Sequence, residues 1–341
     1  MGKKVIIVGD SRKMKGGAST VIKTVERTTL WKKYHCYWLE CQINASIIQK
    51  LLYLLRGIIK GLWKIPQYDI AHFHTTPGNG MRVQLPLMLY ALIWRKKLIL
   101  HLHVGNQMKN HTNDRVFRFC GNHADKLITL GKTWMQYVPV RDKSKITCLY
   151  NPAPNVCKQE QADKYFLFAA YLDAEVNKGY DTLIQAWGLV APRYPGWKLV
   201  VCGSGETALL QRFVEEAGVS DSVETPGWVE GSRKEDYFRR AYAYVMASRN
   251  EGLPMSVLEA IANGVPVIST PEGCLPEFLE DRKSVLFFDF GDAEGLAQRM
   301  SELIEDGALG RHMAGMAGGI VHSAMSINEH IKRLEQIYDS L

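Results

Sequence analysis

Two glutamates, Glu251 and Glu259, stand with seven residues between them in the segment EGLPMSVLEA. Pro254 lies between them, and proline is favoured in the first turn of a helix, where its missing N–H would have no partner. Carboxylates accept hydrogen bonds and repel phosphate, so the pair suits the hydroxyl groups of a sugar or a ribose. The alternative is that both acids only stabilise the positive N-terminal end of a helix.

The helix expected over residues 254–262 follows an apolar run at 243–247. Gly264 stands where a residue with left-handed backbone ends a helix, and Pro266 follows it. The first N–H groups of such a helix have no intrahelical partner and form a binding site for an anion. Gly252 has no side chain, so a ligand can approach its backbone closely. The segment therefore predicts a site that holds an anionic group and hydroxyl groups together.

Four histidines form two His-x-His pairs, His72 with His74 and His101 with His103, at the ends of expected strands. A spacing of two places each pair on one face of its strand. Four convergent imidazoles are able to bind zinc, but burial as neutral, hydrogen-bonded histidines is commoner, and we favour it. The chain has no Asp-x-Asp motif of the kind that holds a divalent metal on a diphosphate. We therefore predict no metal site and no cofactor.

Short apolar runs alternate with helical patterns in both halves, which is typical of doubly wound parallel sheets. We expect two Rossmann-like α/β domains that face a central cleft, over residues 1–154 and 155–322, with a Pro- and Asn-rich boundary at 150–155. We expect residues 323–341 to form a helix that packs back on the first domain. The expected strands are 5–8, 70–73, 98–102 and 126–129, then 165–169, 198–202, 243–247, 265–269 and 284–288.

The composition is that of a globular protein of 341 residues without a disulfide framework. Its seven cysteines form no Cys-x-x-Cys pair, which favours a reducing compartment and a cytoplasmic location. The apolar run that begins at Val5 is too short for a signal peptide, and no uncharged run reaches membrane-spanning length. Residues 1–150 carry 25 Lys and Arg against 7 Asp and Glu, whereas residues 151–341 carry 17 against 28. The basic half shows no nucleic-acid module, so we expect no nucleic-acid partner and consider an anionic membrane first.

Residues 46–64 predict one amphipathic helix with a basic polar face. A wide apolar face with a tryptophan is typical of a helix that lies in a membrane interface, which would make the protein peripheral on the cytoplasmic face. The alternative is a helix that packs its apolar face on the first sheet. The apolar half comprises Ile47, Ile48, Leu51, Leu52, Leu54, Leu55, Ile58, Ile59, Leu62 and Trp63, and the basic residues are Lys50, Arg56, Lys60 and Lys64.

The segment EGLPMSVLEAIANGVPVIST, which contains Glu251 and Glu259, resembles the signature of family 4 glycosyltransferases. Members of this family have the GT-B fold and retain the anomeric configuration. Further similar segments lie in the same order along the chain. They are GDSRKMKGG, DIAHFH and LILHLHVGN in the first half, and KGYDTLIQA, LVVCGSGE, PGWVE and GCLPEFLED in the second.

The resemblance implies a nucleotide-sugar donor, a UDP- or GDP-sugar, with Lys178 on its diphosphate. It assigns the hydroxyls of the donor sugar to Glu251 and the ribose to Glu259. It gives His103 the place of a histidine near the donor sugar and the acceptor, with His101 as the alternative. The other donor-binding positions that it implies are Gly16, Gly17, Gly203, Gly252, Leu253, Pro254, Met255 and Ser256.

One position departs from the family pattern. The family usually has Gly-Arg-Leu shortly before its lysine, with the arginine on the diphosphate, whereas this chain has Tyr171 there. A tyrosine cannot neutralise phosphate charge. Either another base takes its place or donor binding is weak. The candidate bases are Arg12, Lys13, Lys15 and Arg249.

We therefore predict a retaining hexosyltransferase that acts in cell-surface polysaccharide biosynthesis. Its donor would be a nucleotide-diphosphate sugar, and its acceptor a saccharide or a lipid-linked saccharide. One alternative is an epimerase or phosphorylase of the same fold, which converts donor without an acceptor. The other is a non-catalytic protein that binds sugar nucleotides, which the tyrosine at position 171 would suit.

Overall fold

The computed structural model describes residues 2–14, 16–155 and 161–341 and divides the chain into two compact units. The first comprises Met1–Pro152 together with Ile327–Leu341, and the second comprises Ala153–Ser326. Each unit contains one six-stranded sheet, and every strand pair in both sheets is parallel. The prediction of two doubly wound parallel sheets is thus confirmed, and the central cleft between them stays a prediction.

The sheet of the first unit has the strand order β2-β1-β3-β4-β5-β6. The chain moves to one side of β1 with β2 and to the other side with β3, so the order reverses between β1 and β3. Such a reversal is where ligands bind in open α/β sheets. The strands are β1 (Val5–Asp10), β2 (Tyr37–Gln42), β3 (Ile70–Thr75), β4 (Lys97–Leu102), β5 (Lys126–Thr129) and β6 (Ile146–Cys148).

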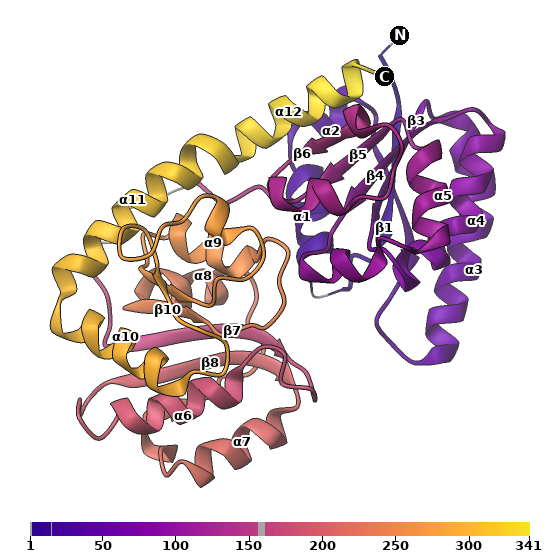
Figure 1. Ribbon diagram of the computed structural model, residues 1–341. Coiled ribbons are helices and arrows are strands. Elements are labelled where there is room, and N and C mark those ends of the chain that lie inside the picture. Colours follow the sequence, from indigo (N-terminus) through magenta and orange to yellow (C-terminus); the bar gives the residue numbers. More distant parts are fainter. Residues whose placement is uncertain (1, 15, 156–160) are drawn as a thin grey trace. The chain divides into compact units, whose positions relative to one another are not determined.

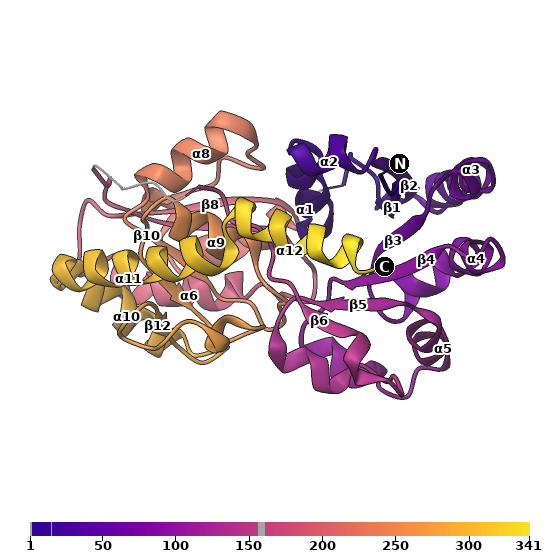
Figure 2. The same cartoon turned by 90° about the horizontal axis from the view of Figure 1, so that it is seen from above.

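Helices cover both faces of this sheet, with α3, α4 and α5 grouped on one side in Figure 2. Phe73 and Leu100 point into the core beneath these three helices, while Ile70 and Ile99 point into the core beneath α1 and the C-terminal helix. The helices are α1 (Gly17–Glu26), α2 (Thr29–Lys33), α3 (Ile47–Lys64), α4 (Asn79–Ile93), α5 (Arg115–His123) and α12 (Ile327–Asp339). Short 3-10 helices lie at Ile65–Gln67, Asn106–His111, Lys132–Tyr137 and Lys143–Lys145.

The C-terminal helix α12 belongs to the first unit (Figure 1). Buried aromatic and polar contacts hold it there. The hydroxyl of Tyr338 lies 2.8 Å from Nδ1 of His72, and the Tyr338 ring meets the Tyr34 ring edge-on at 5.0 Å. Tyr34 also donates to Asp339 at 2.7 Å. Nδ1 of His330 donates to the carbonyl of Tyr150 at 2.9 Å. These contacts fix the last helix on the histidine-bearing face of the sheet.

The sheet of the second unit has the order β12-β11-β10-β7-β8-β9, so its reversal lies between β7 and β10. A core beneath α6, α7 and α10 contains Phe166, Trp187 and Met300. The strands are β7 (Tyr165–Leu172), β8 (Lys198–Gly205), β9 (Val223–Glu224), β10 (Ala243–Met246), β11 (Val267–Ser269) and β12 (Leu286–Phe287). The helices are α6 (Tyr180–Val190), α7 (Thr207–Glu216), α8 (Gly231–Arg240), α9 (Met255–Ala262), α10 (Ala293–Glu305) and α11 (Gly307–Met325), with 3-10 turns at Ser220–Ser222 and Leu275–Glu277.

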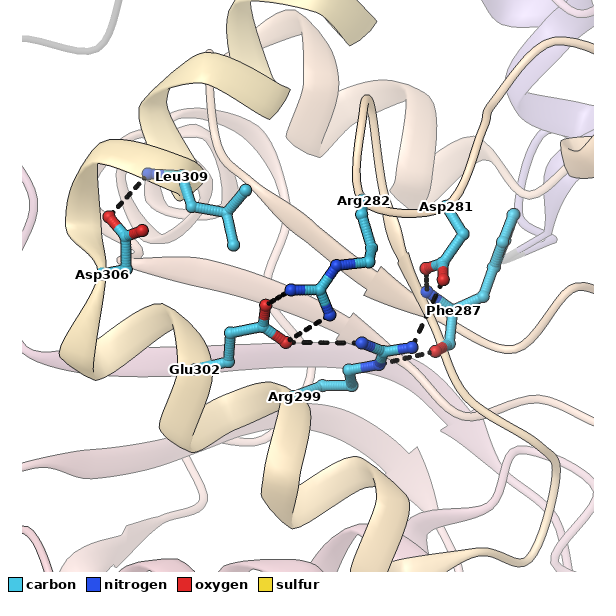
Figure 3. A network of polar contacts seen from close by, with 7 residues as sticks. All are labelled: Asp281, Arg282, Phe287, Arg299, Glu302, Asp306 and Leu309. Atoms are coloured by element: carbon cyan, nitrogen blue, oxygen red, sulfur yellow. Dashed lines mark hydrogen bonds and ion pairs between the residues drawn. The ribbon is translucent and has the colours of Figure 1, made fainter.

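The short edge strand β12 is held by a polar network that links it to α10 (Figure 3). Arg299 of α10 donates to the carbonyl of Phe287 at 3.0 Å and pairs with Asp281 at 3.3 Å. Asp281 in turn accepts from the backbone N–H of Phe287 at 2.8 Å. Glu302 pairs with both Arg299 and Arg282. A strand of two residues has few ladder bonds of its own, so these contacts fix its position.

Candidate active site

The reversal between β7 and β10 brings Lys178 and Glu251 to the same edge of the second sheet. Lys178 follows the carboxyl end of β7, and Glu251 follows the carboxyl end of β10. Because β7 and β10 are paired neighbours, the two loops that leave them lie side by side. This is the position at which doubly wound sheets bind ligands.

Gly179 joins these two loops closely enough to exclude any other residue. Its φ of +66° is left-handed, and a Cβ there would lie 2.0 Å from the carbonyl oxygen of Ala247. The backbone N–H of Arg249 also donates to the carbonyl of Asn177 at 2.7 Å. The Lys-Gly pair of the sequence therefore works as a unit, because the glycine allows the backbone contact that places the lysine.

Lys178 and Glu251 form an ion pair in which Nζ lies 2.6 Å from Oε1. The Lys178 side chain is 29% exposed and the Glu251 side chain 17%, so both remain accessible to a ligand. The structure thus brings together two residues that the sequence separates by 73 positions. Their assignments to diphosphate and to sugar hydroxyls stay predictions.

Glu259 has a basic partner that the sequence did not reveal. Nζ of Lys234, on α8, lies 2.7 Å from Oε1 and 2.6 Å from Oε2 of Glu259. Each acid of the Glu-x7-Glu pair is therefore held by one lysine. Lys234 stands 25 residues before its partner within the polar helix segment GSRKEDYFRR, where nothing distinguishes it from its charged neighbours.

Helix α9 begins between the two acids. Its first intrahelical bond runs from the N–H of Leu258 to the carbonyl of Pro254, so the amides of Met255, Ser256 and Val257 precede the helical ladder. Among the residues that the structure describes, no side chain caps this end. Leu253 is buried. Free amides at a helix start attract an anion, which agrees with the anion site expected here.

The loop before α9 is positioned by the segment that follows β11. Gly273 has a φ of +70°, and a Cβ there would lie 2.2 Å from the carbonyl oxygen of Gly252. The N–H of Cys274 donates to that same oxygen at 2.9 Å. Gly252 is thereby fixed between Glu251 and α9.

Gly203 and Tyr171 lie on the neighbouring strands β8 and β7. A Cβ on Gly203 would lie 2.8 Å from the carbonyl of Ala170, and its N–H donates to Gly227 at 3.1 Å. Tyr171, which replaces the family arginine, is 49% exposed. Arg249 is exposed at the same edge, with its guanidinium 5.7 Å from the centre of the Phe290 ring. Arg249 is therefore the candidate base that lies on the Glu251 loop, where its backbone N–H contacts the Lys178 loop.

In the first unit, Gly16 caps α1 and Gly17 is its first residue, and both are exposed. The extended backbone of Gly16 has no neighbouring atom within 4 Å of where a Cβ would lie, so neither geometry nor packing requires a glycine there. Of the candidate bases in this loop, Arg12 is paired with Glu26 and Glu40. Lys15 lies outside the described residues.

Four histidines at the carboxyl ends of β3 and β4 form one cluster in the first unit, in which His72, His74 and His101 are buried and His103, just after β4, is half-buried. Nδ1 of His74 lies 2.8 Å from Nε2 of His103, and the rings of His101 and His103 stack at 4.5 Å. Burial lowers the pKa of both His72 and His103 to about 3 and holds those of His74 and His101 well below the usual value. The lowered pKa values favour neutral imidazoles. The hydrogen bonds expected with them are present at His72, His74 and His103, whereas His101 has none in the described structure.

This cluster also contains the side chains best placed to hold a metal among the described residues. One nitrogen from each of His72, His74 and His101 lies within 4.8 Å of the other two. Both ring nitrogens of His101 and Nε2 of His72 are buried without a hydrogen-bond partner in the described structure. Zinc binds imidazole nitrogen at about 2.0–2.1 Å, so these rings would have to draw closer.

Helix α3 presents its apolar side chains to the surface of the first unit. Ile47 is 84% exposed and Trp63 is 76% exposed, while Gly57 and Gly61 are the buried positions that pack on β2 and α4. Of the apolar face, Ile58 is partly buried against the core, but most of this face is exposed, which the alternative of a helix packed on the sheet did not predict. Ile93 and Trp94 of the adjacent α4 region add to this exposed apolar surface. Within the described chain, no helix has the length and apolar composition needed to cross a bilayer.

Comparison with known proteins identifies the second unit. Residues 155–317 match the family model described as "Glycosyl transferases group 1". The matched segment covers most of the second unit, so this part of the chain is similar to that glycosyltransferase family. The resemblance to family 4 glycosyltransferases is thus confirmed.

Two similar proteins come from Rhizobium meliloti. The lipopolysaccharide core biosynthesis glycosyltransferase LpsE is 34% identical over 139 residues, which cover 40% of this chain and 39% of LpsE. The chain thus spans about two fifths of the length of that relative. The lipopolysaccharide core biosynthesis mannosyltransferase LpsB is 23% identical over an alignment of 373 positions, which covers 99% of this chain and 97% of LpsB.

The solved structure of Anabaena HepE in complex with UDP has the same fold as this chain. It superposes with a TM-score of 0.79 at 16% identity and covers 99% of this chain and 100% of HepE. At this identity the likeness concerns the fold. It confirms that the two sheets are those of a GT-B protein.

Proposed function

We propose that this protein transfers a sugar from a nucleotide-diphosphate donor to a saccharide or lipid-linked saccharide during cell-surface polysaccharide biosynthesis. The observation that carries the proposal is the placement of Lys178, Glu251 and the free amides of α9 at one edge of the second sheet. An ammonium and free amides suit a diphosphate, and a carboxylate suits sugar hydroxyls. The complexes of HepE with UDP and UDP-glucose support a UDP-sugar as donor.

The proposed reaction uses this chain's own groups to stabilise the leaving diphosphate. Lys178 and the α9 amides meet the charge that develops as the bond between the sugar and the phosphate breaks. The acceptor oxygen bonds to the anomeric carbon from the same face and gives its proton to the departing phosphate oxygen, so the anomeric configuration is retained. Arg249 takes the place of the missing arginine. Glu259 binds the ribose, with Lys234 holding its carboxylate in place. The role that the resemblance gives to His103 stays a prediction.

A thermal-shift screen with UDP, UDP-glucose, UDP-N-acetylglucosamine and GDP-mannose tests donor binding. A ligand that binds the folded state stabilises it by about 2.7 kcal/mol at one hundred times its Kd, so the correct nucleotide raises Tm. EDTA is expected to leave both this shift and transfer unchanged. If no nucleotide shifts Tm, the proposal is wrong. Rapid conversion of donor without any acceptor would instead indicate an epimerase, and binding without turnover a non-catalytic protein.

We further propose that α3 attaches the protein to an anionic membrane. Its exposed apolar face suits the acyl region, and the lysines and arginine beside that face suit anionic headgroups. The charge of the first half complements such a surface.

Vesicle sedimentation tests the attachment. Replacing Ile48, Leu55 and Ile59 together with glutamine is expected to weaken binding to phosphatidylglycerol vesicles by at least about tenfold, because three apolar side chains leave the membrane. Leu189→Gln is the matched control, since Leu189 is an exposed leucine of the second unit. Equal binding of the triple variant and the parent protein would contradict the proposal.

A further inference from the structure

A pocket of about 500 Å³ lies at the free edge of the first unit's sheet, along β2. Helices α1 and α2 border β2 on one side and α3 on the other (Figure 2). Its lining combines aromatic, basic and acidic side chains. The aromatic side chains are those of Trp31, Tyr37, Trp38 and Tyr53.

The charges in this pocket are only partly compensated. Arg12 lies over the Trp38 ring, with 4.3 Å between its guanidinium carbon and the ring centre, and it pairs with Glu26 and Glu40. Lys13, Arg56 and Lys60 also line the pocket, and none of them has an ion-pair partner among the described residues. Both acids are thus occupied by Arg12, and three cations remain for a ligand. Uncompensated Arg and Lys at a pocket favour phosphate.

Helix α3 connects this pocket to the exposed apolar surface. Gly57 and Gly61 form its packed face, because a Cβ on them would lie 2.9 Å from Cys41 and 2.4 Å from Leu87. Tyr53, Arg56 and Lys60 follow a spacing of three and four, which places them on one helix face, directed into the pocket. At about 100° per residue, Leu52, Ile59 and Trp63 lie next to that face on the side away from the glycines.

This order around one helix fits a ligand with three parts. The exposed apolar face suits a hydrocarbon chain, Arg56 and Lys60 suit a phosphate at the level of lipid headgroups, and the aromatic wall suits a sugar ring. A free nucleotide would leave the apolar face unused.

We infer that this pocket binds the acceptor, and that the acceptor is a saccharide joined to a lipid through phosphate. The inference rests on the proposed transferase function, for which it names the acceptor class and the acceptor site. The acceptor's phosphate is held by Arg56 and Lys60, and its saccharide lies among Trp31, Trp38 and Tyr53.

Calorimetry with three water-soluble probes tests this inference on the full-length protein. The probes are glucose 1-(hexyl phosphate), hexyl glucoside and hexyl phosphate. Glucose 1-(hexyl phosphate) is expected to bind at least about tenfold more tightly than either of the others, because it alone engages both the cations and the aromatic wall. Arg56→Gln and Lys60→Gln are each expected to weaken it by about tenfold. Lys50→Gln on the same helix is the control, since Lys50 does not line the pocket.

Equal binding of glucose 1-(hexyl phosphate) and hexyl glucoside would overturn the inference. So would variants of Arg56 and Lys60 that lose binding to phosphatidylglycerol vesicles but keep full affinity for glucose 1-(hexyl phosphate), because these cations would then serve membrane headgroups. The nucleotide thermal shift on the same preparations separates the two proposals. A protein that binds nucleotide but not the probe refutes the acceptor site, whereas one that binds no nucleotide refutes the transferase function.

Discussion

Lys178→Ala is expected to lower kcat for sugar transfer by a factor of about 100 to 1,000, the range seen when one preorganised group that stabilises developing charge is removed. Lys178 is the ammonium at the edge where the α9 amides begin, and its Nζ lies 2.6 Å from Glu251. Without it, the charge that grows on the leaving diphosphate is met by the amides and by Arg249. Initial rates at saturating donor measure the effect.

Lys178 also positions Glu251 through their ion pair. A double-variant cycle separates this role from its proposed role at the diphosphate. If Lys178 only positions Glu251, the Lys178→Ala, Glu251→Ala protein transfers sugar no more slowly than Glu251→Ala. If it also meets the diphosphate, the double variant is slower, which is the result we expect. Lys164→Ala, an exposed lysine of the same unit, serves as the control and keeps the parent rate. A parent-like rate for Lys178→Ala would refute the assignment of this site.

The strands that the sequence predicted and those that it missed differ in their place in the sheet. Central strands such as β3 and β10 are covered on both faces, so they appear as apolar runs. The three unpredicted strands, β2, β6 and β9, all lie at sheet edges. They are short or carry polar residues such as Glu40 and Glu224. An edge strand tolerates such residues because no neighbouring strand pairs with it along its outer edge. These three edge strands therefore lack the pattern that identifies the central strands, whereas the fourth edge strand, β12, lies within the predicted run at 284–288.

In the candidate site, residues with a local backbone signal could be predicted from the sequence, whereas residues that reach the site through tertiary packing could not. Gly179 and Pro254 carry their backbone requirements in their own residue types, so their segments could be recognised from the sequence. Lys234 becomes part of the site only because α8 and α9 pack together, and no spacing within α8 indicates it. Likewise, the packed glycine face of α3 could not be predicted, since a helix pattern does not tell which face meets the sheet.

The first unit is expected to lose at least about 3 kcal/mol of its free energy of unfolding between pH 7.5 and pH 5.5. Burial lowers the pKa of His72 and His103 to about 3 and that of His330 to about 4, whereas an unfolded histidine titrates near 6.5. Below pH 6.5 these histidines are therefore protonated in the unfolded chain but remain unprotonated in the folded unit. Each such histidine costs about 1.4 kcal/mol per pH unit until its folded pKa is reached.

The buried carboxyl group of Asp10 opposes this loss of stability. Burial raises the pKa of Asp10 to about 6, so the folded state binds its proton before the unfolded state does, and acid stabilises the fold at that residue. Burial lowers the pKa of His74 and His101 as well, so five histidines oppose one aspartate and stability falls as pH drops from 6.5 towards 4. Urea unfolding at the two pH values measures the loss. A typical domain has about 5–15 kcal/mol in total, so this loss is a large part of the stability of the first unit.

Variants of one buried and one exposed histidine test whether the buried histidines cause this loss. His330→Gln keeps a donor for the carbonyl of Tyr150 but removes one titrating group, so the loss between pH 7.5 and pH 5.5 is expected to shrink by about 1 kcal/mol. His123→Gln removes an exposed histidine of the same unit and is expected to leave the loss unchanged. The opposite result, in which only the His123 variant responds, would show that the acid sensitivity arises at the surface. The buried cluster would then already accept protons in the folded state, which its burial opposes.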